Sequence, residues 1–336
     1  MSRPTVDFSP ADALAPDSAL LSPMELAVLG VPVRFETNSR YVLDCIDESF
    51  GEWRNVTPDS RAVDSLRVRL IAYAGREGGD ERRDAHVPVR HTCPDSTRLI
   101  AHSPGSIGIS DPARREAVAH VSTELAADRA HFRSAMIEAL TLALVTQFDR
   151  HPLHAAAVAR GRSAVLLAGP SGTGKSTLAW MAHQAGLEVL GDDHIWIQLE
   201  PAPRIWAWPG RVRLLPESME RAPALVTGDA GVVEERDGKR KLVLSLGGAP
   251  GPTRRDIADV VMCALERGEG PAVLERASAA ELAGVLQREV APGFDRFPER
   301  HARVVRVLAQ RGGWRLRLSP DPLEALPLLR RMLDES

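Results

Sequence analysis

One segment of the sequence has the residue types and spacing of a phosphate-binding loop. The residues GPSGTGKS, from Gly169 to Ser176, match the Walker A pattern G-x-x-x-x-G-K-[ST] without a gap. The apolar run AVLLA before them is typical of a buried strand, and TLAWMAHQA after them is typical of a helix. This order places backbone N–H groups and the positive end of a helix dipole around a bound phosphate.

The residues of this loop have separate chemical roles. The glycines allow backbone conformations closed to other residues, so that consecutive N–H groups can converge on phosphate oxygens. Lys175 is expected to reach the β- and γ-phosphates of a nucleotide, and Ser176 is expected to ligate Mg²⁺. The predicted nucleotide-binding residues are Gly169, Pro170, Ser171, Gly172, Thr173, Gly174, Lys175, Ser176 and Thr177.

Two consecutive aspartates follow the next apolar run. Asp192 and Asp193 come after LEVLG, seventeen and eighteen residues beyond Lys175, which is about the length of a helix, a turn and a strand. The end of that strand would return beside the loop, where open α/β sheets bind ligands. One carboxylate there can hold Mg²⁺ and a second can accept a proton from an attacking hydroxyl. The alternative is a turn capped by two aspartates.

A histidine precedes the loop. His154 lies in HPLHAAAV, at the start of a predicted small-residue strand that forms a hairpin at 160–162 with the strand leading into the loop. A single histidine at such a place can be a packed structural residue or part of a site. Spacing alone leaves both interpretations open.

The elements around these residues predict an α/β protein with three parts. Residues 1–22 are expected to form a loose tail, and 23–150 a smaller α+β domain. This domain should end in one long helix over 122–148, because Phe132, Met136, Leu140, Leu144 and Phe148 recur at spacing four. Residues 151–336 should form the catalytic domain, with later strands at DIADVVMCAL and WRLRLS, a hairpin around RDGKRKLVLSL and three helices towards the C-terminus.

Composition excludes some classes of partner. The net charge is −3 and the one short basic run, RDGKRK, is typical of a solvated turn, so nucleic acid is not expected as a partner. The three cysteines lie far apart without metal-type spacing, which fits a reducing cytoplasm. No apolar run is long enough to span a membrane, and the first residues lack the apolar core of a signal peptide. A cytoplasmic protein is therefore expected.

The order of these motifs resembles the catalytic core of HPr kinase/phosphorylase. The shared features are "LHAAAV", a hairpin, GPSGTGKST and "VLGDDHI", and they cover mainly residues 151–200. The match is nearer to HPr-kinase-like proteins that phosphorylate other targets, including those of peptide-modifying pathways such as lasso peptide biosynthesis. The resemblance implies a P-loop catalytic domain that uses ATP and Mg²⁺, and a homo-oligomer, since HPr kinases are hexamers.

The resemblance also implies roles for single residues. Asp193 would be the base that takes the proton from a serine hydroxyl, with Asp192 beside it at the metal. His154 would complete the site close to the attacking group, and Lys175 would bind the transferred phosphate.

Two family features have no secure counterpart in this chain. Where the family carries a metal-binding glutamate in an E-I-R-G-L-G-like element, this chain has WPGRVRLLPES, and Glu217 is not assigned. For the catalytic arginine the candidates are Arg211, Arg213 and Arg221, of which Arg221 is placed in the predicted site. Residues 239–241 are candidates for gripping substrate. The segment associated with phosphorolysis is poorly matched.

Three functions follow as hypotheses. The first is a kinase that transfers the γ-phosphoryl group of ATP to a serine-type hydroxyl of a protein or peptide. The second is a small-molecule kinase of the shikimate or gluconate type, although an arginine-rich lid is not evident in the sequence. The third is a nucleotide-dependent regulator without turnover. The sequence does not identify the phosphate acceptor.

Overall fold

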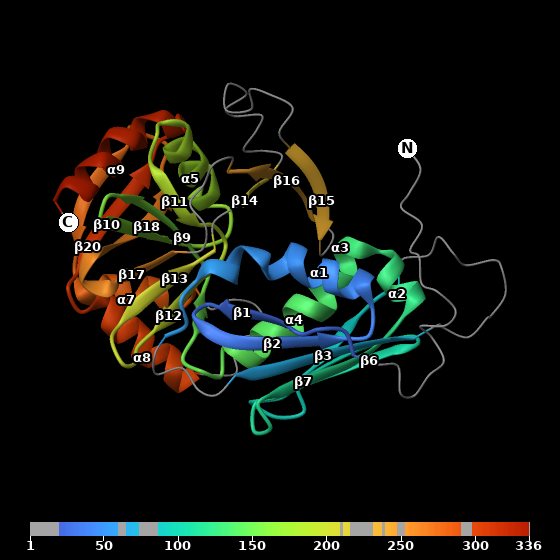
Figure 1. Cartoon of the computed structure of the whole chain (residues 1–336). Coiled ribbons are helices and arrows are strands. Elements are labelled where there is room, and N and C mark those ends of the chain that lie inside the picture. The colour runs from blue at the N-terminus through green and yellow to red at the C-terminus, as the bar shows by residue number, and fades with distance from the viewer. Residues whose placement is uncertain are drawn as a thin grey trace. The chain divides into compact units, whose positions relative to one another are not determined.

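The computed structural model describes residues 20–59, 65–73, 87–208, 211–215, 231–236, 239–246, 253–289 and 298–335. Helices and several sheets occur in the same chain, so the predicted mixed α/β class is confirmed (Figure 1). The chain divides into two compact units, Met1–Phe148 and Asp149–Ser336. Within the described residues, no helix is both long and apolar enough to cross a membrane.

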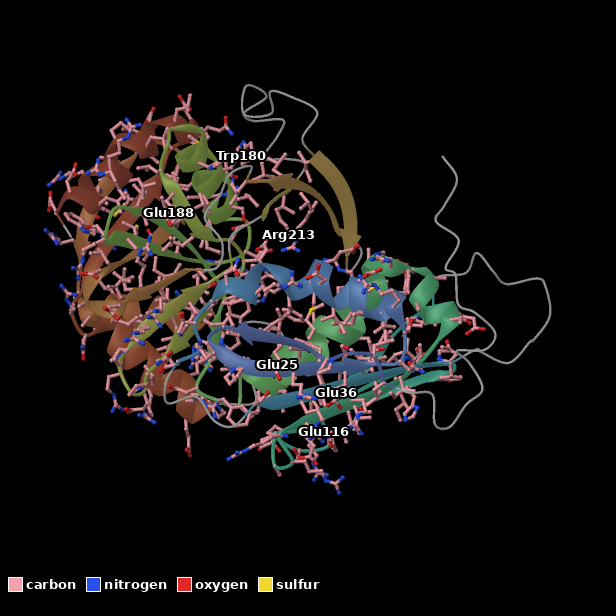
Figure 2. All side chains as sticks on the ribbon, in the orientation of Figure 1. Glu25, Glu36, Glu116, Trp180, Glu188 and Arg213 are labelled. Atoms are coloured by element: carbon pink, nitrogen blue, oxygen red, sulfur yellow. The ribbon has the colours of Figure 1, made fainter. Side chains whose placement is uncertain are left out.

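The first unit is built on a seven-stranded sheet with the order β1-β2-β3-β7-β6-β5-β4. Neighbours are antiparallel except at the β2–β3 and β3–β7 pairs. Apolar residues alternate along β3, so one face of the sheet is buried against helices and the other carries charged residues such as Glu36 (Figure 2). The strands are β1 (Met24–Val28), β2 (Val31–Thr37), β3 (Leu66–Tyr73), β4 (Arg90–Thr92), β5 (Leu99–Ser103), β6 (Ser106–Asp111) and β7 (Glu116–Ser122).

The prediction of one long helix over 122–148 is wrong. Ser122 is the last residue of β7, and the segment after it is divided into α2 (Thr123–Ala127), α3 (Arg129–Phe132), the π-helical turn η3 (Arg133–Glu138) and α4 (Ala139–Val145). Asp128 breaks the helix, because its backbone is not helical and its side chain accepts a hydrogen bond from the N–H of His131. The spacing-four stripe is buried from Phe132 to Leu144, but it begins after the break, so the pattern did not reveal it.

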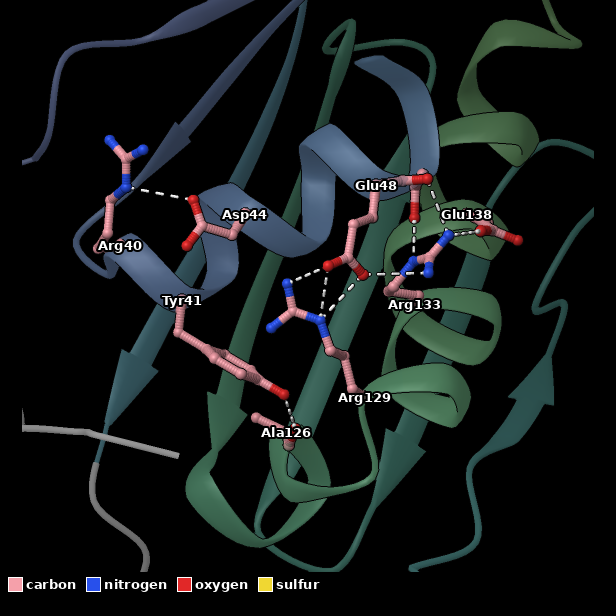
Figure 3. A network of polar contacts seen from close by, with 9 residues as sticks. Arg40, Tyr41, Asp44, Glu48, Ala126, Arg129, Arg133 and Glu138 are labelled. Carbon is pink, nitrogen blue, oxygen red and sulfur yellow. Dashed lines mark hydrogen bonds and ion pairs between the residues drawn. The ribbon is translucent and has the colours of Figure 1, made fainter. Parts of the chain in front are cut away.

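A charged cluster joins α1 (Arg40–Phe50) to this broken helix (Figure 3). Arg129 donates three hydrogen bonds to the Glu48 carboxylate, and Arg133 donates to the carboxylate and backbone carbonyl of the same residue. Helix α1 begins after Ser39, whose side chain accepts a hydrogen bond from the N–H of Val42, and it is followed by η2 (Gly51–Asn55). The cluster ties together helices that are about eighty residues apart in the sequence.

The second unit has a central six-stranded sheet with the order β11-β9-β10-β18-β20-β19. One face packs on α5 (Lys175–Gln184) and α9 (Ala325–Asp334), and the other packs on α7 (Ala279–Leu286), α8 (Pro298–Ala309) and a four-stranded sheet (Figure 1). Because both faces are covered, β9 and β10 are almost wholly apolar. The central strands are β9 (Ala155–Arg160), β10 (Ser163–Ala168), β11 (Glu188–Gly191), β18 (Val260–Arg267), β19 (Val273–Ala277) and β20 (Gly313–Leu318).

Two smaller sheets complete this unit. The four-stranded sheet has the order β17-β13-β12-β8, and its bounds are β8 (His151–Leu153), β12 (Ile195–Gln198), β13 (Arg204–Ala207) and β17 (Thr253–Asp256). The three-stranded sheet contains the predicted hairpin and has the order β14-β16-β15, with β14 (Arg211–Leu214), β15 (Gly231–Arg236) and β16 (Lys239–Ser245). Short 3-10 turns are η5 (Ile257–Asp259) and η6 (Pro322–Glu324).

A buried pair of histidines joins β8 to α8. His301 Nε2 lies 3.1 Å from the carbonyl oxygen of Leu286 and must carry a proton to donate there. His301 Nδ1 is therefore the acceptor for His151 Nε2, at 2.9 Å. Burial lowers the pKa of His151 to about 3 and also lowers the pKa of His301. Both rings are thus neutral in the folded protein.

This pair predicts loss of stability in mild acid. In the unfolded chain a histidine has a pKa of about 6.5 and is protonated below that pH, whereas the folded pair stays neutral. The unfolded state therefore binds more protons below about pH 6.5, so the free energy of unfolding has its full value above that pH and decreases below it. The free energy of unfolding should decrease by up to roughly 1.4 kcal/mol per pH unit for each histidine. Urea unfolding at pH 7.5 and 5.5 measures this. His151→Gln should flatten the pH dependence and His183→Gln should not. Equal slopes in both variants would contradict the assignment.

Candidate active site

The predicted strand-loop-helix is confirmed. Strand β10 ends at Ala168, the loop follows, and α5 begins at Lys175. Gly174 precedes the helix with φ of 113°, a conformation that a residue with a Cβ rarely adopts. The predicted hairpin before the loop is also present, since β9 pairs antiparallel with β10 across Gly161.

Lys175 is a buried charge directed back at its own loop. It is 5% exposed, and its Nζ donates to the carbonyls of Gly169, at 2.5 Å, and Pro170, at 3.3 Å. Burial lowers the pKa of Lys175, while the nearby charges of Glu289, Asp193 and Asp192 act in the opposite direction. A cation in low-dielectric surroundings interacts strongly with an anion that enters them, such as a phosphate group.

Asp192 lies directly after β11 and is buried. Its Oδ2 accepts a hydrogen bond of 3.0 Å from the backbone N–H of Arg213 on β14 (Figure 2), while its Oδ1 has no partner among the described residues. Burial raises the pKa of Asp192 and the Asp193 charge raises it further, with the Arg213 N–H and the Ser176 hydroxyl acting against them. The unpartnered Oδ1 of Asp192 and the hydroxyl of Ser176 are two oxygen ligands of the kind that Mg²⁺ prefers.

Asp193 faces two basic side chains. Lys241 Nζ lies 3.4 Å from its Oδ2, and His154 Nε2 lies 3.9 Å from its Oδ1. Burial alone would raise the pKa of Asp193, but the Lys241 charge and weaker contributions lower it overall. The backbone of Asp193 has φ of 66°, a left-handed conformation that Asp and Asn tolerate better than most residues. The carboxylate is therefore ionised and held in a constrained geometry.

His154 lies in the bend between β8 and β9, with a quarter of its side chain exposed. Its backbone N–H donates to the carbonyl of Glu289 at 3.1 Å, which ties it to the segment after α7. Burial lowers the pKa of His154, the Lys175 charge lowers it further, and the Asp193 charge raises it. A neutral imidazole beside an ionised carboxylate can accept or donate a hydrogen bond to an incoming hydroxyl.

The structure therefore brings Lys175, Asp192, Asp193 and His154 together in one site. Of the three arginine candidates, Arg221 lies outside the described residues, and only the backbone of Arg211 is described. Arg213 is at the site, through its N–H and its charge. Glu217 lies outside the described residues and only the backbone of Lys239 is described, whereas Lys241 contacts Asp193.

Sequence reasoning missed two residues of this site. Glu289 is 4% exposed and is the largest carboxylate influence on Lys175, but no motif surrounds it in the sequence. Arg267 donates from Nε to the loop carbonyl of Gly172 at 2.6 Å. It lies two residues beyond the predicted strand DIADVVMCAL and is the last residue of β18 (Val260–Arg267), and ligand sites of α/β sheets lie at the carboxyl ends of strands.

The fold and the site define a mixed α/β protein with a strand-loop-helix beside paired aspartates. No family model and no curated protein matches the chain. Among solved structures, it is similar to the Hpr(Ser) kinase/phosphatase from Coxiella burnetii, at 12% sequence identity and a TM-score of 0.27. This match covers 55% of the present chain and 99% of that one.

Proposed function

We propose that this chain is an ATP- and Mg²⁺-dependent kinase that phosphorylates a serine-type hydroxyl of a protein or peptide. The observation that carries the proposal is the position of Asp193, an ionised and partly buried carboxylate that shares one site with the buried cation Lys175. A phosphate-binding loop alone would support only nucleotide binding. A carboxylate beside it, fixed by Lys241 and His154, adds a group that can orient and deprotonate an acceptor.

The residues present fit a magnesium ion. Among the described residues, no group of three or more His, Cys, Asp or Glu side chains could hold a metal by itself. Mg²⁺, however, is commonly bound through one or two carboxylates together with substrate phosphates and water. Ser176 and the unpartnered Oδ1 of Asp192 would hold it, and the ion would neutralise charge on the phosphates.

The side chains of the site would divide the reaction between them. Lys175 would leave the carbonyls of Gly169 and Pro170 and donate to the phosphates. Asp193 would accept the proton of the acceptor hydroxyl while the oxygen of that hydroxyl forms a bond to the γ-phosphorus. The bond from that phosphorus to the β–γ bridging oxygen breaks, and ADP leaves with the electron pair. Positioning and charge neutralisation would supply most of the catalysis, because the transition state is loose.

The two basic groups on Asp193 suit this role. The Lys241 ammonium holds the carboxylate where a hydroxyl can approach it and lowers its pKa, and the His154 imidazole lies 3.9 Å from the other carboxylate oxygen. A carboxylate of low pKa is a weak base, but phosphoryl transfer of this kind needs a well-oriented nucleophile more than a strong base. We propose a macromolecular acceptor because the sequence motifs of this chain resemble those of serine kinases.

The test is the fate of the γ-phosphoryl group. Purified protein is incubated with γ-labelled ATP, Mg²⁺ and a cell extract divided by size into macromolecules and metabolites. Label on serine in the macromolecular fraction, lost when Mg²⁺ is chelated, is the expected result. Label only in the metabolite fraction would favour a small-molecule kinase, and nucleotide binding without transfer to either fraction would favour a regulator.

A further inference from the structure

The tip of the phosphate loop is a tight turn. The N–H and the hydroxyl of Thr173 both donate to the carbonyl of Pro170, at 3.1 and 2.8 Å. Gly172, the third residue of the turn, has φ of 83°, as a type II turn requires at that position. Pro170, Ser171, Gly172 and Thr173 therefore form one unit, and its outward carbonyl belongs to Gly172.

Packing holds the two ends of the loop but not this tip. A Cβ added at Gly169 would lie 2.7 Å from the carbonyl oxygen of Leu265, and one added at Gly174 would lie 3.0 Å from Leu318 Cδ1. A Cβ added at Gly172 would meet nothing within 4 Å. The ends of the loop are thus packed against the ends of β18 and β20, while the tip needs another restraint.

Arg267 supplies this restraint. Its Nε donates to the carbonyl of Gly172 at 2.6 Å. Arg267 is the last residue of β18, which runs parallel to β10 with Ala264 opposite Ala168, so the arginine and the loop leave the sheet at the same edge. The N–H of Gly268 donates to the carbonyl of Leu318 at 2.8 Å, which fixes the backbone behind the arginine.

We infer that Arg267 is a positioning residue for nucleotide binding, which fixes the tip of the phosphate loop through the Gly172 carbonyl. The peptide unit between Gly172 and Thr173 is planar, so its carbonyl and N–H point in opposite directions. Holding the Gly172 carbonyl outward keeps the Thr173 N–H on the inner side of the turn, where it donates to Pro170. This inference rests on the proposed nucleotide-binding role of the loop.

Two substitutions separate this hydrogen bond from the charge of the arginine. In Arg267→Gln, the amide nitrogen lies the same number of bonds from Cα as Nε does in arginine, so it can donate to Gly172 without a charge. In Arg267→Met, the side chain is about as long as that of glutamine but has no donor. The matched control is Arg162→Met, which removes an arginine from the opposite edge of the same sheet, where Arg162 pairs with Asp259 at 3.3 Å.

The readout is the affinity for a fluorescent ADP analogue with Mg²⁺. Arg267→Met should bind it roughly three- to tenfold more weakly, which is the effect of losing one hydrogen bond. Arg267→Gln should recover affinity to within about twofold of the unsubstituted protein, and Arg162→Met should leave it unchanged. Recovery by glutamine would also show that the methionine variant has not lost affinity through misfolding.

Three results would overturn the inference or its basis. Unchanged affinity in Arg267→Met would show that the tip does not need the arginine. Equal loss in the glutamine and methionine variants would show that the charge acts on the nucleotide directly. Absence of binding by the unsubstituted protein would instead remove the proposed function, so the two failures are distinguishable.

Discussion

Replacement of Asp193 by asparagine is expected to abolish phosphoryl transfer and to leave nucleotide binding intact. Asparagine has nearly the same shape and tolerates the left-handed backbone at this position, where φ is 66°. It cannot accept the proton of a hydroxyl, and removal of a general base commonly costs about 10²- to 10⁴-fold in rate. The measurements are the rate of label transfer from γ-labelled ATP and the affinity for a fluorescent ADP analogue.

The control for this variant is Asp259→Asn. Asp259 also pairs with a basic side chain, Arg162, but lies at the opposite edge of the sheet from the loop. This variant should transfer phosphate at the unsubstituted rate. Undiminished transfer by Asp193→Asn would disprove the assignment of the base. Loss of nucleotide affinity in the same variant would mean that Asp193 acts on the nucleotide and not on the acceptor.

The core of the second unit was predictable because its information is local in sequence. The apolar run before Gly169, the glycines and the helix after Lys175 are consecutive, and each has a strong conformational preference. The aspartates could be placed near the loop because one helix and one strand separate them from it. In the first unit, the break at Asp128 was missed because the buried stripe at spacing four starts only at Phe132, after the break.

The contacts that complete the site were not predictable. Lys241 reaches Asp193 across 48 residues of sequence, and Arg267 reaches Gly172 across 95. Such pairs form only when particular strands become neighbours in the sheets, and the sequence around a single lysine or arginine does not indicate which strands will do so. Glu289 illustrates the same limit, since it is an isolated carboxylate after a helix until tertiary structure brings it to Lys175.

The second large effect is expected from Lys175→Met, which should remove nucleotide binding and transfer without destabilising the protein. Loss of a preorganised donor to the phosphates should lower the transfer rate by at least about 10²-fold. The pKa of Lys175 is lowered by burial even after the favourable influence of Glu289, Asp193 and Asp192, so the folded state holds this charge at a net cost in free energy.

Methionine is of similar length and removes that cost. The melting temperature of Lys175→Met without nucleotide should therefore equal or exceed that of the unsubstituted protein. The rise in melting temperature that ATP and Mg²⁺ produce by binding the folded state should disappear.

Ser176→Ala is the matched control, because it removes a proposed metal ligand from the next residue without removing a charge. It should weaken the nucleotide-dependent rise and leave the nucleotide-free melting temperature unchanged. A lower melting temperature in Lys175→Met would mean that the lysine stabilises the fold, and a retained nucleotide-dependent rise would mean that it does not bind the phosphates. Equal or greater stability with lost binding is the combination expected of a buried cation kept for its function.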